Sequence, residues 1–89
     1  MRYRPEVGIR AAPMDDGGLV LLSERSGKLY RCSSTAAKMW TALHQHGGRP
    51  EAAADAVAAQ YDTEPARVRA DLNVLIDKLR RTGLVKAEP

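Results

Sequence analysis

Few side chains in this 89-residue sequence have a type and spacing that could perform chemistry. The sequence has one cysteine, Cys32, and two histidines, His44 and His46. A catalytic cysteine needs a base, usually a histidine, and a further group that orients the base. Because both histidines are separated from Cys32 by a full predicted helix, we expect no nucleophilic pair. Cys32 is instead expected to fill the corner between a strand and a helix as a small apolar side chain.

The same residues predict neither a metal site nor an acid–base pair. His44 and His46 are two residues apart, so they face different sides of a helix, and we expect them to interact with its C-terminal end. Asp15, Asp16 and Glu24 fall in predicted turns, and the glycine pairs lack the spacing of a phosphate-binding loop. The sequence therefore predicts no catalytic residue, no metal and no cofactor.

Composition predicts one small domain that spans residues 1–89. The net charge of +3 is mildly basic and small for a nucleic-acid-binding protein. A single cysteine excludes an internal disulfide and suits a reducing compartment. No secretory signal is present, and no apolar run approaches the ~18 residues of a membrane span. We expect a cytoplasmic protein with no membrane or nucleic-acid partner.

The elements that must position the candidate residues begin with a β-rich first third, at about residues 7–32. Three segments of strand length, 7–10, 19–22 and 28–32, are separated by turn-forming aspartates and glycines. Gly27 can supply the positive φ of the turn before the last segment. The pattern predicts a short strand followed by a hairpin, which together form a three-stranded antiparallel sheet.

Three helices follow the sheet and are predicted at about 33–46, 50–61 and 63–82. Ser33 or Ser34 can cap the first helix, and Gly47–Gly48 ends it. Pro50 and Pro65 fit the first turns of the second and third helices. The order of these elements predicts an α+β, winged-helix-like fold in which the N-terminal sheet precedes the helices.

Apolar residues spaced at i, i+3, i+4 and i+7 give each helix a stripe that faces the core. The predicted stripes contain Ala36, Met39, Trp40 and Leu43; Ala54, Val57, Ala58 and Tyr61; and Val68, Leu72, Leu75, Ile76 and Leu79. Beside the last stripe, at about 100° per residue, one flank of the third helix carries charges and a valine. These flank residues are Arg67, Asp71, Val74 and Lys78.

Two positions have two interpretations that the residues alone leave open. Val74 is either an ordinary exposed valine or part of a rim against which a partner packs. Tyr30 is either a half-buried core residue or, with Leu29, part of the lining of a peptide groove.

Several motifs resemble those of PqqD-like proteins, and the resemblance extends over nearly the whole chain. The family's strand-to-helix signature contains Leu-Asn, Thr-Ala or Thr-Gly, and aliphatic-Trp pairs. The corresponding pairs here are Cys32-Ser33, Thr35-Ala36 and Met39-Trp40. The closing helix matches the family pattern at Asp71, Leu75, Leu79 and Gly83-Leu84-Val85. Cys32-Ser33 departs from Leu-Asn, although Ser33 can still cap the helix.

PqqD-like proteins recognise the leader segments of ribosomally made, modified peptides. The resemblance implies a non-catalytic module on which the leader adds a strand to the hairpin edge and lies against the third helix. The residues implied in peptide binding lie on the last strand and the third helix. They are Lys28, Leu29, Tyr30, Arg31, Cys32, Arg67, Val68, Asp71, Val74, Leu75 and Lys78.

Within this family, the chain most resembles the leader-binding protein of lasso-peptide pathways. The resemblance implies a leader containing Tyr-x-x-Pro and a separate leader peptidase to which the leader is delivered, with the cyclase as a further candidate partner. An alternative is the peptide chaperone of a quinone-cofactor pathway. A different class of function is a winged-helix DNA-binding protein whose third helix contacts phosphates, although Asp71 and Asp77 interrupt that basic surface.

Overall fold

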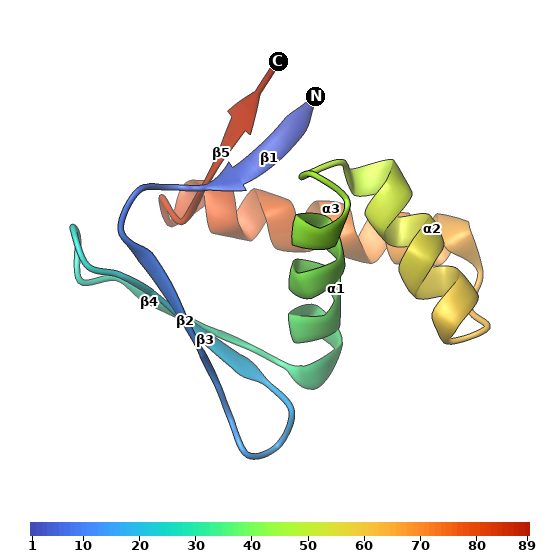
Figure 1. Ribbon diagram of the computed structural model, residues 1–89, viewed down its shortest axis with the longest axis horizontal. Coiled ribbons are helices and arrows are strands. Elements are labelled where there is room, and N and C mark those ends of the chain that lie inside the picture. The colour runs from blue at the N-terminus through green and yellow to red at the C-terminus, as the bar shows by residue number, and fades with distance from the viewer.

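Five strands and three helices make up the computed structural model, which describes residues 1–89 (Figure 1). In chain order the elements are β1 (Arg2–Pro5), β2 (Ile9–Pro13), β3 (Leu19–Ser23), β4 (Leu29–Cys32), α1 (Ser34–Gln45), α2 (Pro50–Gln60), α3 (Pro65–Arg81) and β5 (Val85–Glu88). The strands form two antiparallel sheets, ordered β2-β3-β4 and β1-β5. The predicted α+β class, the three-stranded sheet and the three helices are confirmed.

The prediction was wrong in omitting β1 and β5, which join the two ends of the chain. They pair from Arg2↔Glu88 to Pro5↔Val85. A strand whose partner lies at the other end of the chain leaves little local signal. β1 is also tied to the loop after α1, because its Tyr3 N–H donates to the Gly48 carbonyl oxygen at 2.8 Å. Gly48 has a φ of +80°, and a Cβ there would collide with the Tyr3 backbone, so this approach requires glycine.

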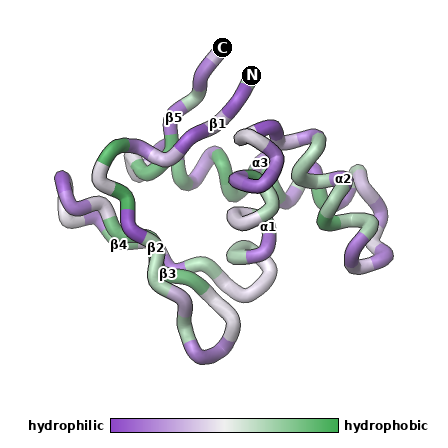
Figure 2. Tube along the Cα trace, in the orientation of Figure 1, coloured by the Kyte–Doolittle hydropathy of each residue, from purple (hydrophilic) through white to green (hydrophobic).

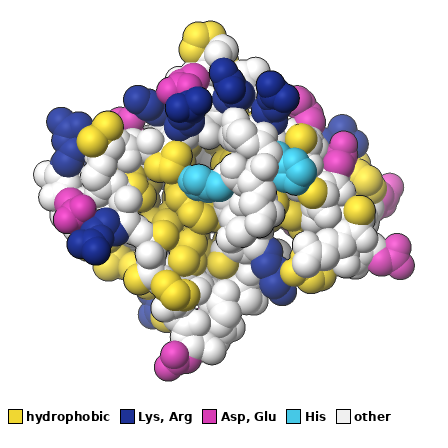
Figure 3. Space-filling view, viewed as in Figure 1, with side chains coloured by type: hydrophobic (Ala, Val, Ile, Leu, Met, Phe, Trp, Pro, Cys, Tyr) yellow, Lys and Arg dark blue, Asp and Glu magenta, His cyan; other side chains and the backbone are white.

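The inner face of the three-stranded sheet meets the helices. Alternation along the central strand β3 places Leu19, Leu21 and Ser23 on this face. Leu21 is fully buried, and its ladder partner Tyr30 is half-buried and packs against the same core. Apolar atoms gather between the sheet and α1 in the space-filling view (Figure 3). Cys32 pairs with Leu19 and therefore lies on the inner face too.

Local signals set the ends of α1 as predicted. The Ala36 N–H donates to Ser33 Oγ at 3.2 Å, so Ser33 is the capping residue. After α1, Gly47 and Gly48 both have positive φ values, which stop the helix. Because α1 starts directly after β4, this cap fixes the angle at which the strand turns into the helix.

The core stripe of α3 is buried as predicted, from Val68 to Leu79, and its apolar and polar residues alternate along the trace (Figure 2). The predicted stripe of α2 was wrong at Tyr61, which is 43 % exposed. α2 ends at Gln60, and Tyr61 caps it with its ring beneath the Lys38 ammonium, 4.7 Å from the ring centroid. No helix combines the length and the apolar composition that crossing a membrane requires.

Candidate functional site

β4 forms one free edge of the three-stranded sheet, and two of its residues present unpaired backbone groups there. The Ser23 N–H donates to the Lys28 carbonyl oxygen at 2.9 Å at the start of the β3–β4 ladder. Hydrogen-bonded pairs alternate along an antiparallel ladder, so the next residues bonded to β3 are Tyr30 and Cys32. The N–H and C=O groups of the intervening residues therefore point into the open edge; these residues are Leu29 and Arg31.

The opposite edge, β2, is less suited to pairing with another strand. By the same alternation, the backbone of Val20 faces β2, where it pairs with Ala12. The backbone N–H and C=O groups of Ile9 and Ala11, and the C=O of Pro13, therefore point to the open edge of β2. Pro13 has no N–H to donate, and proline is a common way of blunting an edge strand. Strand addition is therefore favoured at β4.

In the view of Figure 1, α3 runs from right to left above β4, which runs from left to right. At one end, Asp71 of α3 lines a hollow with Thr35 and Met39 of α1, the helix that directly follows β4. At the other end, Thr82 lines a second hollow with Lys28, the residue before β4. An extended segment added to β4 would therefore lie alongside α3.

One flank of α3 faces the start of α1, and the other faces β1 and α2. Arg69 and Asn73 line a hollow with Tyr3 of β1, and the Arg80 guanidinium lies over the Tyr3 ring at 5.9 Å from its centroid. Asp71, in contrast, faces the start of α1. The flank that turns away from β1, on the side of the hollow at Asp71, is therefore the one that consists of Arg67, Asp71, Val74 and Lys78.

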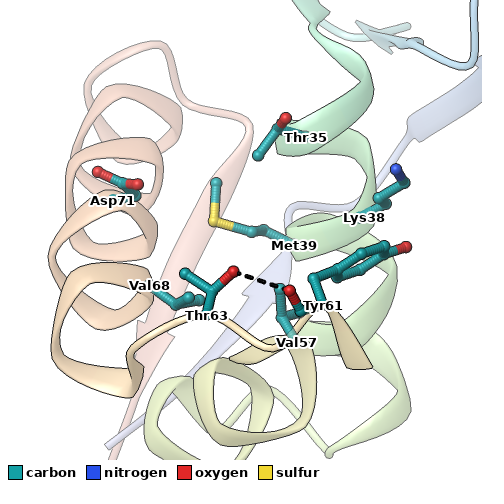
Figure 4. Close-up of a pocket in the computed structure, with 8 residues that line it drawn as sticks. All are labelled: Thr35, Lys38, Met39, Val57, Tyr61, Thr63, Val68 and Asp71. Carbon is teal, nitrogen blue, oxygen red and sulfur yellow. Dashed lines mark hydrogen bonds between the residues drawn. The ribbon is translucent and has the colours of Figure 1, made fainter. Parts of the chain in front are cut away.

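The hollow between α1 and α3 has a volume of about 270 Å³ (Figure 4). Met39, Val57 and Val68 give it an apolar lining, while Lys38 and Asp71 stand on opposite sides of it. At one end, the Thr63 hydroxyl donates to the Tyr61 carbonyl oxygen at 3.2 Å. Such a cavity suits an apolar or aromatic side chain whose polar tip remains near the rim.

The predicted binding residues differ in their exposure. Those on the surface are Lys28, Leu29, Arg31, Arg67, Asp71, Val74 and Lys78. Tyr30 is half-buried, whereas Cys32, Val68 and Leu75 are only 3 %, 6 % and 5 % exposed, so these three support the surface from below. Leu29 and Tyr30 lie on opposite faces of the sheet and do not line the same groove.

Sequence reasoning missed the residues that α1 and the α2–α3 loop contribute to the hollow, chiefly Thr35, Met39 and Thr63. Met39 was assigned to the core stripe of its helix, and it is indeed 6 % exposed. A buried residue at the floor of a hollow has the same periodicity as any core residue. No sequence signal separates the two cases.

Positive charge dominates the rim of the site. Lys28 and Arg31 lie on the strand side, Arg67 and Lys78 lie on the helix side, and Asp71 is the one acidic residue among the predicted binding residues. None of these side chains takes part in the three ion pairs of the structure. An extended segment with acidic residues therefore complements this surface.

The cysteine and the histidines, which were the candidates for chemistry, have structural roles. Burial raises the pKa of the Cys32 thiol, which keeps it protonated and a poor nucleophile. Nδ1 of His44 lies 2.9 Å from the Trp40 carbonyl oxygen, and its ring lies against the Trp40 indole with centroids 4.3 Å apart. The two histidines lie apart on the face shown in Figure 3. No group of three or more His, Cys, Asp or Glu side chains is placed to hold a metal ion.

Comparisons with known proteins identify the family and two similar structures. Residues 18–85 match the family described as Coenzyme PQQ synthesis protein D (PqqD). The structure of TbiB1 in complex with the TbiA(beta) leader peptide is 26 % identical, with a TM-score of 0.81 over 97 % of this chain and 98 % of that one. Lasso peptide synthetase B1 complexed with the leader peptide is 28 % identical, with a TM-score of 0.82 over 98 % and 100 %. No curated protein matches the sequence.

Proposed function

This chain belongs to the PqqD family, and we propose that it is a non-catalytic, single-domain module that captures a precursor leader peptide by strand addition to β4. The observation that carries the proposal is the open edge at Leu29 and Arg31, whose two ends are joined to α3 by the hollows at Asp71 and Thr82. Backbone pairing supplies affinity, and alternate side chains of the peptide supply selectivity. Both similar structures are complexes with leader peptides, which supports the same role here. We also class the fold as winged-helix-like.

The captured leader is delivered to a separate leader peptidase in lasso-peptide biosynthesis, with the cyclase as a further partner. The similarity to lasso peptide synthetase B1 supports this pathway. The family description supports the alternative, in which the chain is the peptide chaperone of a quinone-cofactor pathway. A neighbouring set of precursor, peptidase and cyclase genes distinguishes the first pathway from the second. The expected location is the cytoplasm.

The hollow between α1 and α3 is the proposed pocket for an anchoring side chain of the leader. Its apolar lining and charged rim fit the tyrosine of a Tyr-x-x-Pro motif, with the ring against Met39 and Val68 and the hydroxyl near Asp71. The hollow lies at the start of α1, the helix that directly follows β4. A peptide paired with β4 therefore reaches it by continuing past the end of that strand.

The DNA-binding alternative has less support, because Asp71 and Asp77 interrupt the basic surface of α3 and several of its cations also contact groups within the protein. Arg81 forms an ion pair with Asp77 at 3.1 Å. The Arg80 guanidinium lies over the Tyr3 ring, and Arg69 Nε donates to the Pro65 carbonyl oxygen at 3.4 Å. A reading helix needs its cations free to contact phosphates.

Calorimetric titration with the leader peptide and with duplex DNA tests the proposed function. We expect saturable binding of the leader with a shallow dependence on salt, because backbone hydrogen bonds and apolar contacts carry most of the affinity. DNA is expected to bind weakly or not at all. If the protein does not bind the leader but binds DNA with an affinity that falls steeply with salt concentration, it is instead a nucleic-acid-binding protein.

A further inference from the structure

The outer face of the three-stranded sheet, which turns away from the helices, is uncovered and apolar at its centre. The ladder places Leu22 beside Leu29 and Ala12 beside Val20 on this face. Leu29 is 58 % exposed, and Val20 and Leu22 are half-buried without packing against the hydrophobic core. A sheet face of this composition is normally covered by another layer. A contiguous apolar patch that is left open marks an interaction surface.

Two arginines flank the apolar centre of this outer face. Arg10 is the ladder partner of Leu22, and Arg31 is the ladder partner of Val20. Arg31 forms no ion pair, and Arg10 has only a long contact of 3.8 Å with exposed Glu24. Such an exposed pair is worth little, so both guanidinium groups remain free to bind carboxylates. A second copy of the chain would bring arginines against the same basic face, and charge therefore disfavours self-association.

We propose that the outer face, formed by Arg10, Ala12, Val20, Leu22, Leu29 and Arg31, docks the partner enzyme that acts on the captured peptide. The complementary surface is apolar and carries carboxylates that pair with Arg10 and Arg31. This inference rests on the proposed function, because it assigns a surface to the enzyme that receives the leader.

The peptide itself extends the docking face. A leader strand added to β4 lies next to Leu29 and Arg31, and every second side chain of that strand points to the outer face. The sheet thereby widens by one strand, and the enzyme contacts the protein and its cargo together. The face of the empty protein is small, and a small interface gives a weak and transient complex. Loading with leader is therefore expected to tighten the association.

Two substitutions outside the leader edge test this surface: Leu22→Lys and Arg10→Glu. Each is expected to keep the leader affinity within about twofold of wild type and to lower the rate of leader removal by the pathway's peptidase about tenfold or more. Ala59→Lys and Arg49→Glu make matched charge changes at exposed positions away from the sheet and should leave both quantities unchanged. Circular dichroism establishes whether each variant is folded. If Leu22→Lys does not fold, Arg10→Glu alone carries the test.

Each other outcome has a definite meaning. If the folded variants support the peptidase at the wild-type rate, the outer face is not the docking surface, although the proposed function stands. If both variants lose leader binding, this face belongs to the leader site itself. A wild-type dimer in sedimentation that Leu22→Lys dissociates would show that a second copy covers the face. A wild-type protein that binds no leader would overturn the proposed function separately.

Discussion

Substitution of Val74 by aspartate is expected to weaken leader binding by roughly 1–3 kcal/mol, or about 5- to 150-fold in Kd. Val74 is 55 % exposed on the α3 flank that also carries Asp71 and Lys78. A leader peptide in this groove covers the side chain, so the new carboxylate would be desolvated without a partner. The free protein should keep its stability, because Val74 lies off the buried stripe that contains Leu72 and Leu79. Calorimetric titration and thermal unfolding measure the two effects.

The opposite flank of α3 provides the controls for this prediction. Arg69, Asn73 and Arg80 face β1 and α2, so their replacement by alanine should leave the leader affinity near that of wild type. A leader affinity that responds to Arg69 but not to Val74 would mean that the peptide lies on the other side of the helix.

Substitution of Arg31 by proline is expected to lower the leader affinity about tenfold or more, because it removes a backbone donor from the free edge. The Arg31 N–H points away from β3, so the sheet itself loses no hydrogen bond. The pyrrolidine ring occupies the place of that N–H and also holds the leader strand away. Calorimetric titration measures the affinity, and thermal unfolding reports whether the sheet persists.

Two matched variants separate the backbone effect from other causes. Arg31→Ala removes the same side chain and charge but keeps the N–H, so its loss of affinity should be much smaller. Ala11→Pro places a proline on β2, at a position whose backbone N–H points to the opposite open edge of the sheet. It should leave leader binding unchanged. Equal affinities of Arg31→Pro and Arg31→Ala would argue against backbone pairing at this edge.

Features of the fold with a strong local signal could be predicted from the sequence. The stripe of α3 extends over a 17-residue helix, and Ser33 caps α1 by a contact three residues along the chain. β1 and β5 could not be predicted in the same way. Arg2-Tyr3-Arg4 has one apolar residue, and the strand forms because the other end of the chain and the Gly48 loop meet it. Tyr61 fitted the periodicity of α2, but the helix ends one residue before it.

The candidate site depends on tertiary structure more than the helices do. Helical periodicity places Asp71, Val74 and Lys78 on one flank of α3, but only the packing of Arg80 and Tyr3 shows which flank is turned from β1. The apolar run 19–22 predicted a strand but did not distinguish its two faces. In the structure Leu21 is buried while Val20 and Leu22 face outward, because the helices cover only one face of the sheet.

Hydrogen exchange at individual backbone amides of β4, measured by NMR with and without the leader peptide, tests capture by strand addition most directly. Exchange at Leu29 and Arg31 should slow by about tenfold or more when the leader binds, because those N–H groups gain a partner only then. The Tyr30 and Cys32 amides are bonded to β3 in the free protein and should change little. Leader binding that leaves Leu29 and Arg31 exchanging at their free rates, with protection confined to α2, would contradict strand addition at β4.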